Sequence, residues 1–369
     1  ENDLLLAECY GEYHRLRARH ERVGPEDFRS RLGGRFPEFL DLIADDTVGG
    51  EVPRGLPEDL TPRTFGDYTL LRVLGRGRHG TVYEAVQRSL GRKVALKLLQ
   101  VGFDVEPEAF CRFEREAKAC AQVRHRHVVE IHEARHVDRQ PFYAMSLVPG
   151  RTLAEVIRAG EAPEPRELCR ALAGIADALH ALHAEGIIHR DVKPSNIMVE
   201  PGGEMVLADF GLARSTLAQT FTLDGQLVGT PLYMSPEQIV GKRRLIDRSS
   251  DVYGLGATLY EALAGRPPFV ADDIAVLVRA ILRERPPDVA SVVPGVPRDC
   301  ARIAMKAIEF RKSDRYGDAA ELRDDLLAFA NGRPVSGRPV SPLRRCARRR
   351  WPCLTALAAL LLGVVGLVV

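Results

Sequence analysis

Short runs of alternating apolar and polar residues characterise the chain between Tyr68 and residue 148. Glycines and other turn residues separate the runs, a pattern that predicts antiparallel strands joined by tight connections. The expected strands occupy residues 68–74, 81–87, 93–99, 131–134 and 141–147. Between the third and fourth, residues 107–123 place apolar side chains on one face of a helix. We therefore expect a strand-rich lobe with one helix.

After Gly150 the apolar spacing changes to every three or four residues, which is typical of helices. The first apolar stripe runs from Leu168 to Leu182 and stops before Gly186, a residue suited to ending a helix. Further amphipathic stretches follow at residues 251–263, 273–282, 297–308 and 319–330. The whole pattern predicts an α+β fold with a second, mainly helical lobe.

Residues 1–64 show helical patches and then a Gly/Pro-rich passage, and we interpret them as a helical N-terminal extension with a linker. With 369 residues, 45% of them hydrophobic, the chain has enough apolar material for a sizeable core. The net charge of +2 gives no reason to expect a nucleic-acid partner. The seven cysteines form no Cys-x-x-Cys pair, which favours a reducing compartment over a disulfide framework or zinc site.

The last residues combine a basic segment with an apolar run. Seven arginines and no acidic residue lie between Arg333 and Arg350, and residues 351–369 carry no charge. A membrane-spanning helix needs about 20 such residues, and basic flanks mark its cytoplasmic side. We expect a basic juxtamembrane segment at 332–350 and a transmembrane helix at 351–369, with a buried helix or apolar tail as the alternative. Because the chain starts at Glu1 and stops within this run, we also expect it to be part of a longer protein.

A glycine-rich connection lies between the first two predicted strands. Gly75, Gly77 and Gly80 precede Val82, and this spacing lets backbone N–H groups approach phosphates closely. An ordinary hairpin would explain the pattern about as well. A dinucleotide-binding fold has similar glycines but requires a helix next, whereas here a strand follows.

One lysine, Lys97, stands in an otherwise apolar strand. Since a buried lysine needs a negative partner, we expect it to pair with Glu116 on the predicted helix. The alternative is a lysine at a strand end whose ammonium reaches water.

Two polar motifs follow strands or helices of the second lobe. His189-Arg190-Asp191-Val192-Lys193-Pro194-Ser195-Asn196 brings an acid, a lysine and an amide into one loop, a set able to accept a hydroxyl proton, steady a phosphate and bind a metal. A polar turn would not require these residue types in this order. Asp209, followed by Phe210 and Gly211, ends a short apolar strand and is suited to bind Mg²⁺.

With these motifs in order, the region 65–331 resembles a protein kinase domain, and more narrowly the bacterial transmembrane Ser/Thr kinases of eukaryotic type. The resemblance implies a bilobal fold, with an N-lobe at 65–148 and a C-lobe at 149–331. It implies ATP and Mg²⁺ as cofactors and proteins with Ser or Thr hydroxyls as substrates. It also implies a single-pass protein of the cell membrane with a cytoplasmic kinase domain, and a homodimer is kept open.

The resemblance assigns roles residue by residue. Asp191, Lys193 and Lys97 would be catalytic, with Asp191 acting on the substrate hydroxyl, Lys193 on the γ-phosphate and Lys97 on the α/β-phosphates. Asn196 and Asp209 would bind the metal. The remaining nucleotide-binding residues would be Leu74, Gly75, Arg76, Gly77, Gly80, Val82, Ala95, Glu116, Met145, Ser146 and Val148.

Lys193 resembles the Ser/Thr form of the catalytic loop, and residues 229–237 resemble the segment that receives the substrate peptide. The resemblance also implies that Glu237 pairs with Arg315 and that Asp251 braces the catalytic loop. Because Arg190 precedes Asp191, we expect a phosphorylated loop hydroxyl to pair with it. The candidates are Ser215, Thr216, Thr220 and Thr222, of which the last two are preferred.

Two other functions compete with this interpretation. A pseudokinase scaffold would have lost catalytic groups, yet Lys97, Asp191, Asn196 and Asp209 are all present. A small-molecule phosphotransferase would not need a complete peptide-receiving segment.

Overall fold

The computed structural model divides into two compact units, Glu1–Thr61 and Pro62–Val369, and the second contains every residue described below. Within it the structure describes residues 63–77, 80–99, 107–137, 140–209, 231–240, 243–271 and 273–336. The predicted N-terminal extension, the phosphorylation candidates at 215–222 and the predicted membrane helix at 351–369 lie outside these residues. Among the described residues, no helix is both long and apolar enough to cross a membrane.

A six-stranded antiparallel sheet forms the first lobe. Its order is β1-β2-β3-β4-β6-β5, so only the last two strands depart from chain order. The strands are β1 (Arg63–Phe65), β2 (Tyr68–Gly77), β3 (Gly80–Gln87), β4 (Arg92–Leu99), β5 (Ile131–Val137) and β6 (Gln140–Ser146). Five of them match the runs predicted from the sequence; β1, with three residues, is too short to give a pattern.

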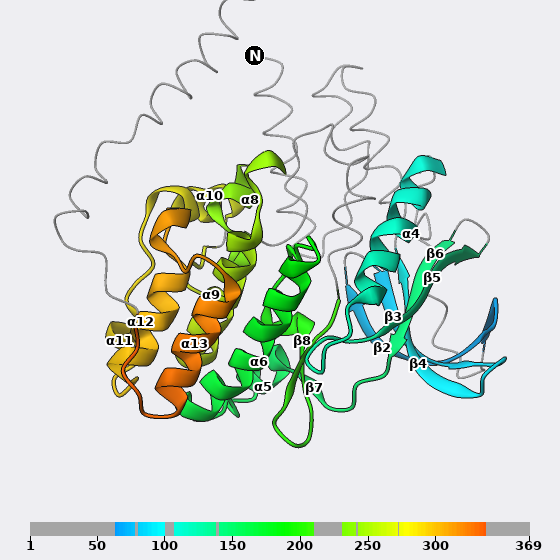
Figure 1. Cartoon of the computed structure of the whole chain (residues 1–369), viewed down its shortest axis with the longest axis horizontal. Coiled ribbons are helices and arrows are strands. Elements are labelled where there is room, and N and C mark those ends of the chain that lie inside the picture. The colour runs from blue at the N-terminus through cyan, green and yellow to red at the C-terminus, as the bar shows by residue number, and fades with distance from the viewer. Residues whose placement is uncertain are drawn as a thin grey trace, which may run out of the picture. The chain divides into compact units, whose positions relative to one another are not determined.

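Helix α4 (Pro107–Gln122) lies beside this sheet (Figure 1) and contacts β5. Its Ala117 and Cys120 are buried, while Lys118 between them is exposed, as the predicted apolar face requires. The helix thus presents Glu116, one residue before Ala117, near the edge of the face that packs on the sheet.

A small three-stranded sheet lies in the second lobe. It contains β7 (Arg151–Thr152), β8 (Ile197–Val199) and β9 (Met205–Leu207) in that order. Backbone hydrogen bonds tie β9 to the segment just before β5, with Val129 N–H donating to Leu207 O at 2.9 Å and Leu207 N–H donating to His127 O at 2.8 Å. These bonds fix the end of β9, and therefore Asp209 beyond it, relative to the first lobe.

Helices make up most of the second lobe. They are α5 (Leu153–Arg158), α6 (Pro165–Ala184), α8 (Pro236–Ile239), α9 (Arg248–Ala264), α10 (Ile274–Arg283), α11 (Val289–Val292), α12 (Arg298–Ala307) and α13 (Ala319–Ala330), with 3-10 turns η1 (Pro194–Asn196), η4 (Pro231–Tyr233), η5 (Arg243–Leu245) and η6 (Lys312–Asp314). Helix α6 is followed by Gly186 at φ 73°, the left-handed conformation expected after a helix end. Helix α9 is buried along nearly its whole length, which explains why its sequence shows only a weak polar face.

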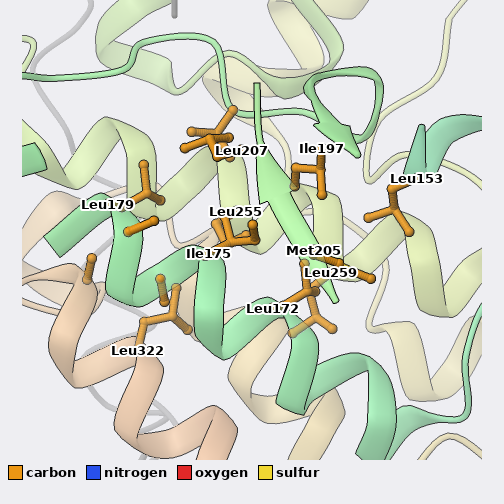
Figure 2. Close-up of a cluster of buried hydrophobic side chains, with 14 of the residues drawn as sticks. Leu153, Leu172, Ile175, Leu179, Ile197, Met205, Leu207, Leu255, Leu259 and Leu322 are labelled. Carbon is orange, nitrogen blue, oxygen red and sulfur yellow. The ribbon is translucent and has the colours of Figure 1, made fainter. Parts of the chain in front are cut away.

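The core of this lobe forms around α6. Figure 2 shows Leu172, Ile175 and Leu179 of α6 among apolar side chains of β9, α9 and α13. Every labelled side chain in that cluster is at most 1% exposed. The core thus provides a rigid base for the loop that runs from α6 to β8 and carries His189 to Asn196.

Candidate active site

The glycine-rich connection joins β2 to β3. Gly77 pairs with Gly80 and Gly75 pairs with Val82 in the antiparallel register. Gly80 has φ 140°, and a Cβ there would lie 1.9 Å from the carbonyl oxygen of Leu98, so no other residue fits without displacing backbone. A strand follows directly, which excludes the dinucleotide-binding arrangement. Leu74 and Arg76, on β2, are both exposed.

The predicted adenine-side residues meet where β4 pairs with β6. Ala95 lies opposite Met145 and Val94 opposite Ser146, and both Ala95 and Met145 are buried. Val148 follows β6 in the segment that leads to the second lobe and is half-buried. The register therefore brings residues far apart in the chain to one edge of the site.

Lys97 is buried in β4 and forms its ion pair with Asp209, not with Glu116 as predicted. Lys97 and Glu116 are both described, and no ion pair joins them. Glu116 is half-buried and has other interactions. The prediction was right that this lysine needs a carboxylate and wrong about which one, because Asp209 is delivered by the far lobe, a placement that helical spacing cannot reveal.

Asp251 of α9 holds the backbone of the catalytic loop, as expected. Its carboxylate accepts hydrogen bonds from the N–H groups of His189 at 2.9 Å and Arg190 at 2.7 Å. The imidazole of His183 lies 2.8 Å from the same carboxylate. Arg190 has φ 64°, a strained conformation for a non-glycine residue that these two bonds support.

Asp191 is the centre of the loop's polar contacts. The Lys193 ammonium donates to Asp191 Oδ2 at 2.8 Å, and the Asn196 amide donates to Asp191 Oδ2 at 3.0 Å and to its backbone carbonyl at 2.8 Å. Both bonds come from the Asn196 amide nitrogen, and among the described residues its Oδ1 accepts no hydrogen bond. The loop thus orients an acid and leaves a carbonyl oxygen available beside it.

Asp209 also has φ in the left-handed region, at 56°. Its Oδ1 accepts from the Lys97 ammonium and, at 2.5 Å, from the hydroxyl of Tyr143. Desolvation acts to raise the pKa of Asp209, but the charge and hydrogen bond of Lys97, helped by Tyr143, outweigh it and hold the pKa below its ordinary value. Ala208, the residue before Asp209, donates its N–H to the backbone carbonyl of Asn196 at 2.8 Å, which brings the two motifs to one site. The Asp191 carboxylate opposes the lowering of the Asp209 pKa.

The oxygens that remain suit a magnesium ion. Asp209 Oδ2 and Asn196 Oδ1 make no hydrogen bond within the described part of the chain, and both are hard oxygen donors. The Asp209 side chain is 29% exposed, so the carboxylate is only partly shielded from solvent. No group of three or more His, Cys, Asp or Glu able to hold a metal occurs among the described residues. Mg²⁺ commonly takes one or two protein ligands and completes its shell with water and substrate phosphates, so this donor set fits the ion.

A second predicted pair lies in the second lobe. Arg315 forms a two-pronged contact with Glu237, with nitrogen–oxygen distances of 2.8 and 2.9 Å. The Arg315 side chain is fully buried and that of Glu237 is 7% exposed. Glu237 is the second residue of α8 and the last residue of the segment expected to receive a peptide.

The model of the protein kinase domain matches residues 68–325, which is well over half of the chain. The chain belongs to the protein kinase family. The bilobal fold and the order of the motifs along it agree with this membership, and the general resemblance drawn from the sequence is confirmed.

Bacterial Ser/Thr kinases are prominent among the curated relatives of this kinase domain. The chain is 35% identical over 289 residues to a probable Ser/Thr protein kinase PknB of Bifidobacterium longum, covering 75% of this chain and 42% of that protein. It is 38% identical over 259 residues to the Ser/Thr protein kinase PknH of Mycobacterium tuberculosis, covering 70% and 41%. The chain thus spans less than half the length of these curated relatives.

Solved structures give the same family. The PknI kinase domain of Mycobacterium tuberculosis superposes with a TM-score of 0.58 at 27% identity, covering 72% of this chain and 97% of that one. The likeness extends over almost the whole solved domain, so both lobes contribute to it.

Sequence reasoning missed Tyr143 as a residue of the site. It lies in an apolar strand, where a tyrosine is expected simply to pack. Burial, and then the adjacent Asp209 carboxylate, hold the pKa of Tyr143 well above its ordinary value, so its hydroxyl keeps the proton and donates. The one available signal was a tyrosine in a strand predicted to be buried, since its hydroxyl needs a hydrogen-bond partner.

Proposed function

We propose that this protein is an active Ser/Thr protein kinase that transfers the γ-phosphoryl group of ATP to Ser or Thr hydroxyls of proteins. The observation that carries the proposal is the convergence of Asp191, Lys193 and Asn196 with Asp209 and Lys97, where the N–H of Ala208 donates to the backbone carbonyl of Asn196 at 2.8 Å. A pseudokinase scaffold would be expected to lack at least one of these groups, and a metabolite phosphotransferase would not need the peptide-receiving segment.

Each charged or amide residue of the candidate site has a defined role in the proposal. Asp191, oriented by Lys193 and Asn196, orients the substrate hydroxyl and accepts its proton. Lys193 and Lys97 supply positive charge to the transferring phosphoryl group and to the remaining phosphates. Asn196 and Asp209 hold Mg²⁺, which supplies charge neutralisation on the phosphate oxygens when bound.

The glycine-rich strands β2 and β3 have the nucleotide-covering role. Gly75, Gly77 and Gly80 offer backbone N–H groups without side-chain obstruction. Ala95 and Met145 line the adenine side, with main-chain groups of Ser146 and Val148 as hydrogen-bond partners. Leu74, Arg76 and Val82 flank the phosphates.

A phosphorylation assay on the full chain tests the proposal. With Mg²⁺ and labelled ATP, the parent protein should incorporate phosphate on serine or threonine, as determined by phosphoamino-acid analysis. The variants Lys97→Ala and Asp191→Ala should lose the label while keeping their fold. Nucleotide binding without any phosphate incorporation by the parent would instead identify a scaffold.

We further propose that the kinase modifies its own loop at Thr220 or Thr222, with Ser215 and Thr216 as the other candidates. The position of Arg190 next to Asp191 supports this, since an arginine there can pair with a phosphate. Phosphopeptide mapping of active enzyme provides the test, and an unmodified loop in fully active protein would refute the idea.

Membrane attachment is a separate proposal that rests on residues 332–369. The basic segment followed by an uncharged run supports a single span with the kinase domain on the cytoplasmic side. The full chain should resist extraction from membranes by alkaline carbonate, and release into the soluble fraction would contradict the span. A homodimer also stays a prediction, and sedimentation of the detergent-solubilised chain tests it.

A further inference from the structure

Tyr143 is buried in the middle of β6, directly opposite Lys97 of β4 in the antiparallel register. Its side chain has no exposed surface, and the Lys97 ammonium lies 5.8 Å from the centre of its ring. Since side chains alternate along a strand, Tyr143 and Met145 point to the same face. Tyr143 therefore lies on the same face of β6 as Met145, which is proposed to line the adenine side, and two residues before it.

The hydroxyl of Tyr143 donates to Asp209 Oδ1 at 2.5 Å, and this is its one hydrogen bond within the described part of the chain. A buried hydroxyl without a partner is costly, so the contact constrains both residues. β6 is paired with β4 and β5 on its two sides, whereas Asp209 lies two residues beyond the end of β9 and outside any strand. The rigid partner is therefore the tyrosine, and the residue that is positioned is the aspartate.

The two donors to Asp209 share one oxygen. Lys97 and Tyr143 both bond Oδ1, which leaves Oδ2 without a partner among the described residues. Two donors on Oδ1 restrict the rotation of the Asp209 carboxylate, so Oδ2 points away from Lys97 and Tyr143. Asn196 Oδ1, the other proposed ligand atom, is likewise without a hydrogen bond there.

We propose that Tyr143 is a positioning residue for the metal ligand Asp209: its hydroxyl holds Oδ1 so that Oδ2 meets the ion. The inference rests on the proposed binding of Mg²⁺·ATP. Partners that orient a metal ligand in this way commonly change metal affinity 10- to 100-fold when removed.

The test measures nucleotide binding without turnover. ADP affinity is determined by calorimetry on the full chain, with Mg²⁺ and with a chelator, for the parent and for Tyr143→Phe, which removes the hydroxyl alone. The parent should bind ADP more tightly with Mg²⁺. In Tyr143→Phe that gain should shrink by about tenfold, with affinity in chelator within about twofold of the parent.

Tyr316→Phe is the matched control. Tyr316 is equally buried, and its hydroxyl donates to a carboxylate, Asp325, at 2.9 Å in the second lobe. This variant should keep the full Mg²⁺ gain. An unchanged gain in Tyr143→Phe, or equal losses with and without Mg²⁺, would overturn the inference while leaving the kinase proposal intact. A parent protein with no Mg²⁺ gain would overturn the metal assignment itself and the inference with it.

Discussion

Two buried clusters of charge in the second lobe differ in whether their polar atoms are used up. Arg315 places all five of its N–H donors, two on Glu237 and three on the carbonyls of Ser249, Glu309 and Phe310. Glu237 accepts a further bond from the hydroxyl of Ser250. In the cluster around Asp191 and Asp209, by contrast, Asp209 Oδ2 and Asn196 Oδ1 have no partner among the described residues.

This difference separates a structural network from a reactive one. In the network of Arg315 and Glu237 every N–H donor of the arginine is used, so it is closed to a ligand. It holds α8 against the loop before α13. An open one keeps its unsatisfied oxygens at the cost of stability, which is common where a ligand completes the set. The side chains of Asp191 and Asp209 are 9% and 29% exposed, against 0% and 7% for Arg315 and Glu237, so the open cluster is also the one nearer to solvent.

The largest expected effect concerns the open cluster. Asp209→Asn keeps the side-chain shape but removes the charge that Mg²⁺ requires, so we expect the rate of phosphate transfer at saturating ATP to fall about 10³-fold, or about 4 kcal/mol. Asp273→Asn is the control, because Asp273 caps α10 and asparagine caps equally well. A rate within tenfold of the parent would show that the open oxygens do not serve the reaction.

Breaking the closed cluster should affect stability instead. Glu237→Gln leaves the fully buried Arg315 without its counter-charge, and we expect a loss of about 3–5 kcal/mol in the free energy of unfolding by urea. The double variant Glu237→Gln/Arg315→Met should be destabilised by less than the sum of the two single variants, since it also removes the stranded charge. Simple additivity would mean that the pair is not coupled.

The same pair predicts an acid-side pH dependence. Burial acts to raise the pKa of Glu237, but the hydrogen bond and charge of Arg315 outweigh it and lower the pKa below the ordinary 4.5. A lowered pKa in the folded state means that the unfolded chain binds the proton more tightly, so this stabilisation is complete above pH 4.5 and is lost as pH falls through the folded-state value. The stability of the parent should therefore fall more steeply below pH 4.5 than that of Glu237→Gln, and parallel curves would contradict the assignment.

Local patterns predicted most of the fold, and the motifs named the residues of the candidate site. The strands before residue 148 and the long helices α6, α9, α10, α12 and α13 came from apolar spacing alone. Elements of two to four residues, such as β7 and α11, are too short to carry a period. The motif residues could be named because the chemistry needs those side chains in that order.

Contacts between lobes were beyond such reasoning. The partner of Lys97 depends on where β9 ends relative to β4, and the interval between these residues, |i−j| = 112, carries no periodic signal. The role of Tyr143 was hidden for the same reason. Its strand fits an apolar pattern, and only the placement of Asp209 gives its hydroxyl a partner.

The smallest expected effect comes from a third cluster, in which the charges face solvent. Arg323 donates to Asp177 at 2.7 Å, with side chains 29% and 43% exposed. Exposed ion pairs contribute little because water and salt screen them, so Arg323→Ala should change the free energy of unfolding by less than about 1 kcal/mol. Urea unfolding at low and high salt checks this, and the difference between parent and variant should shrink as salt rises. A loss approaching that of Glu237→Gln would contradict the argument that solvent exposure makes the Arg323–Asp177 pair weak.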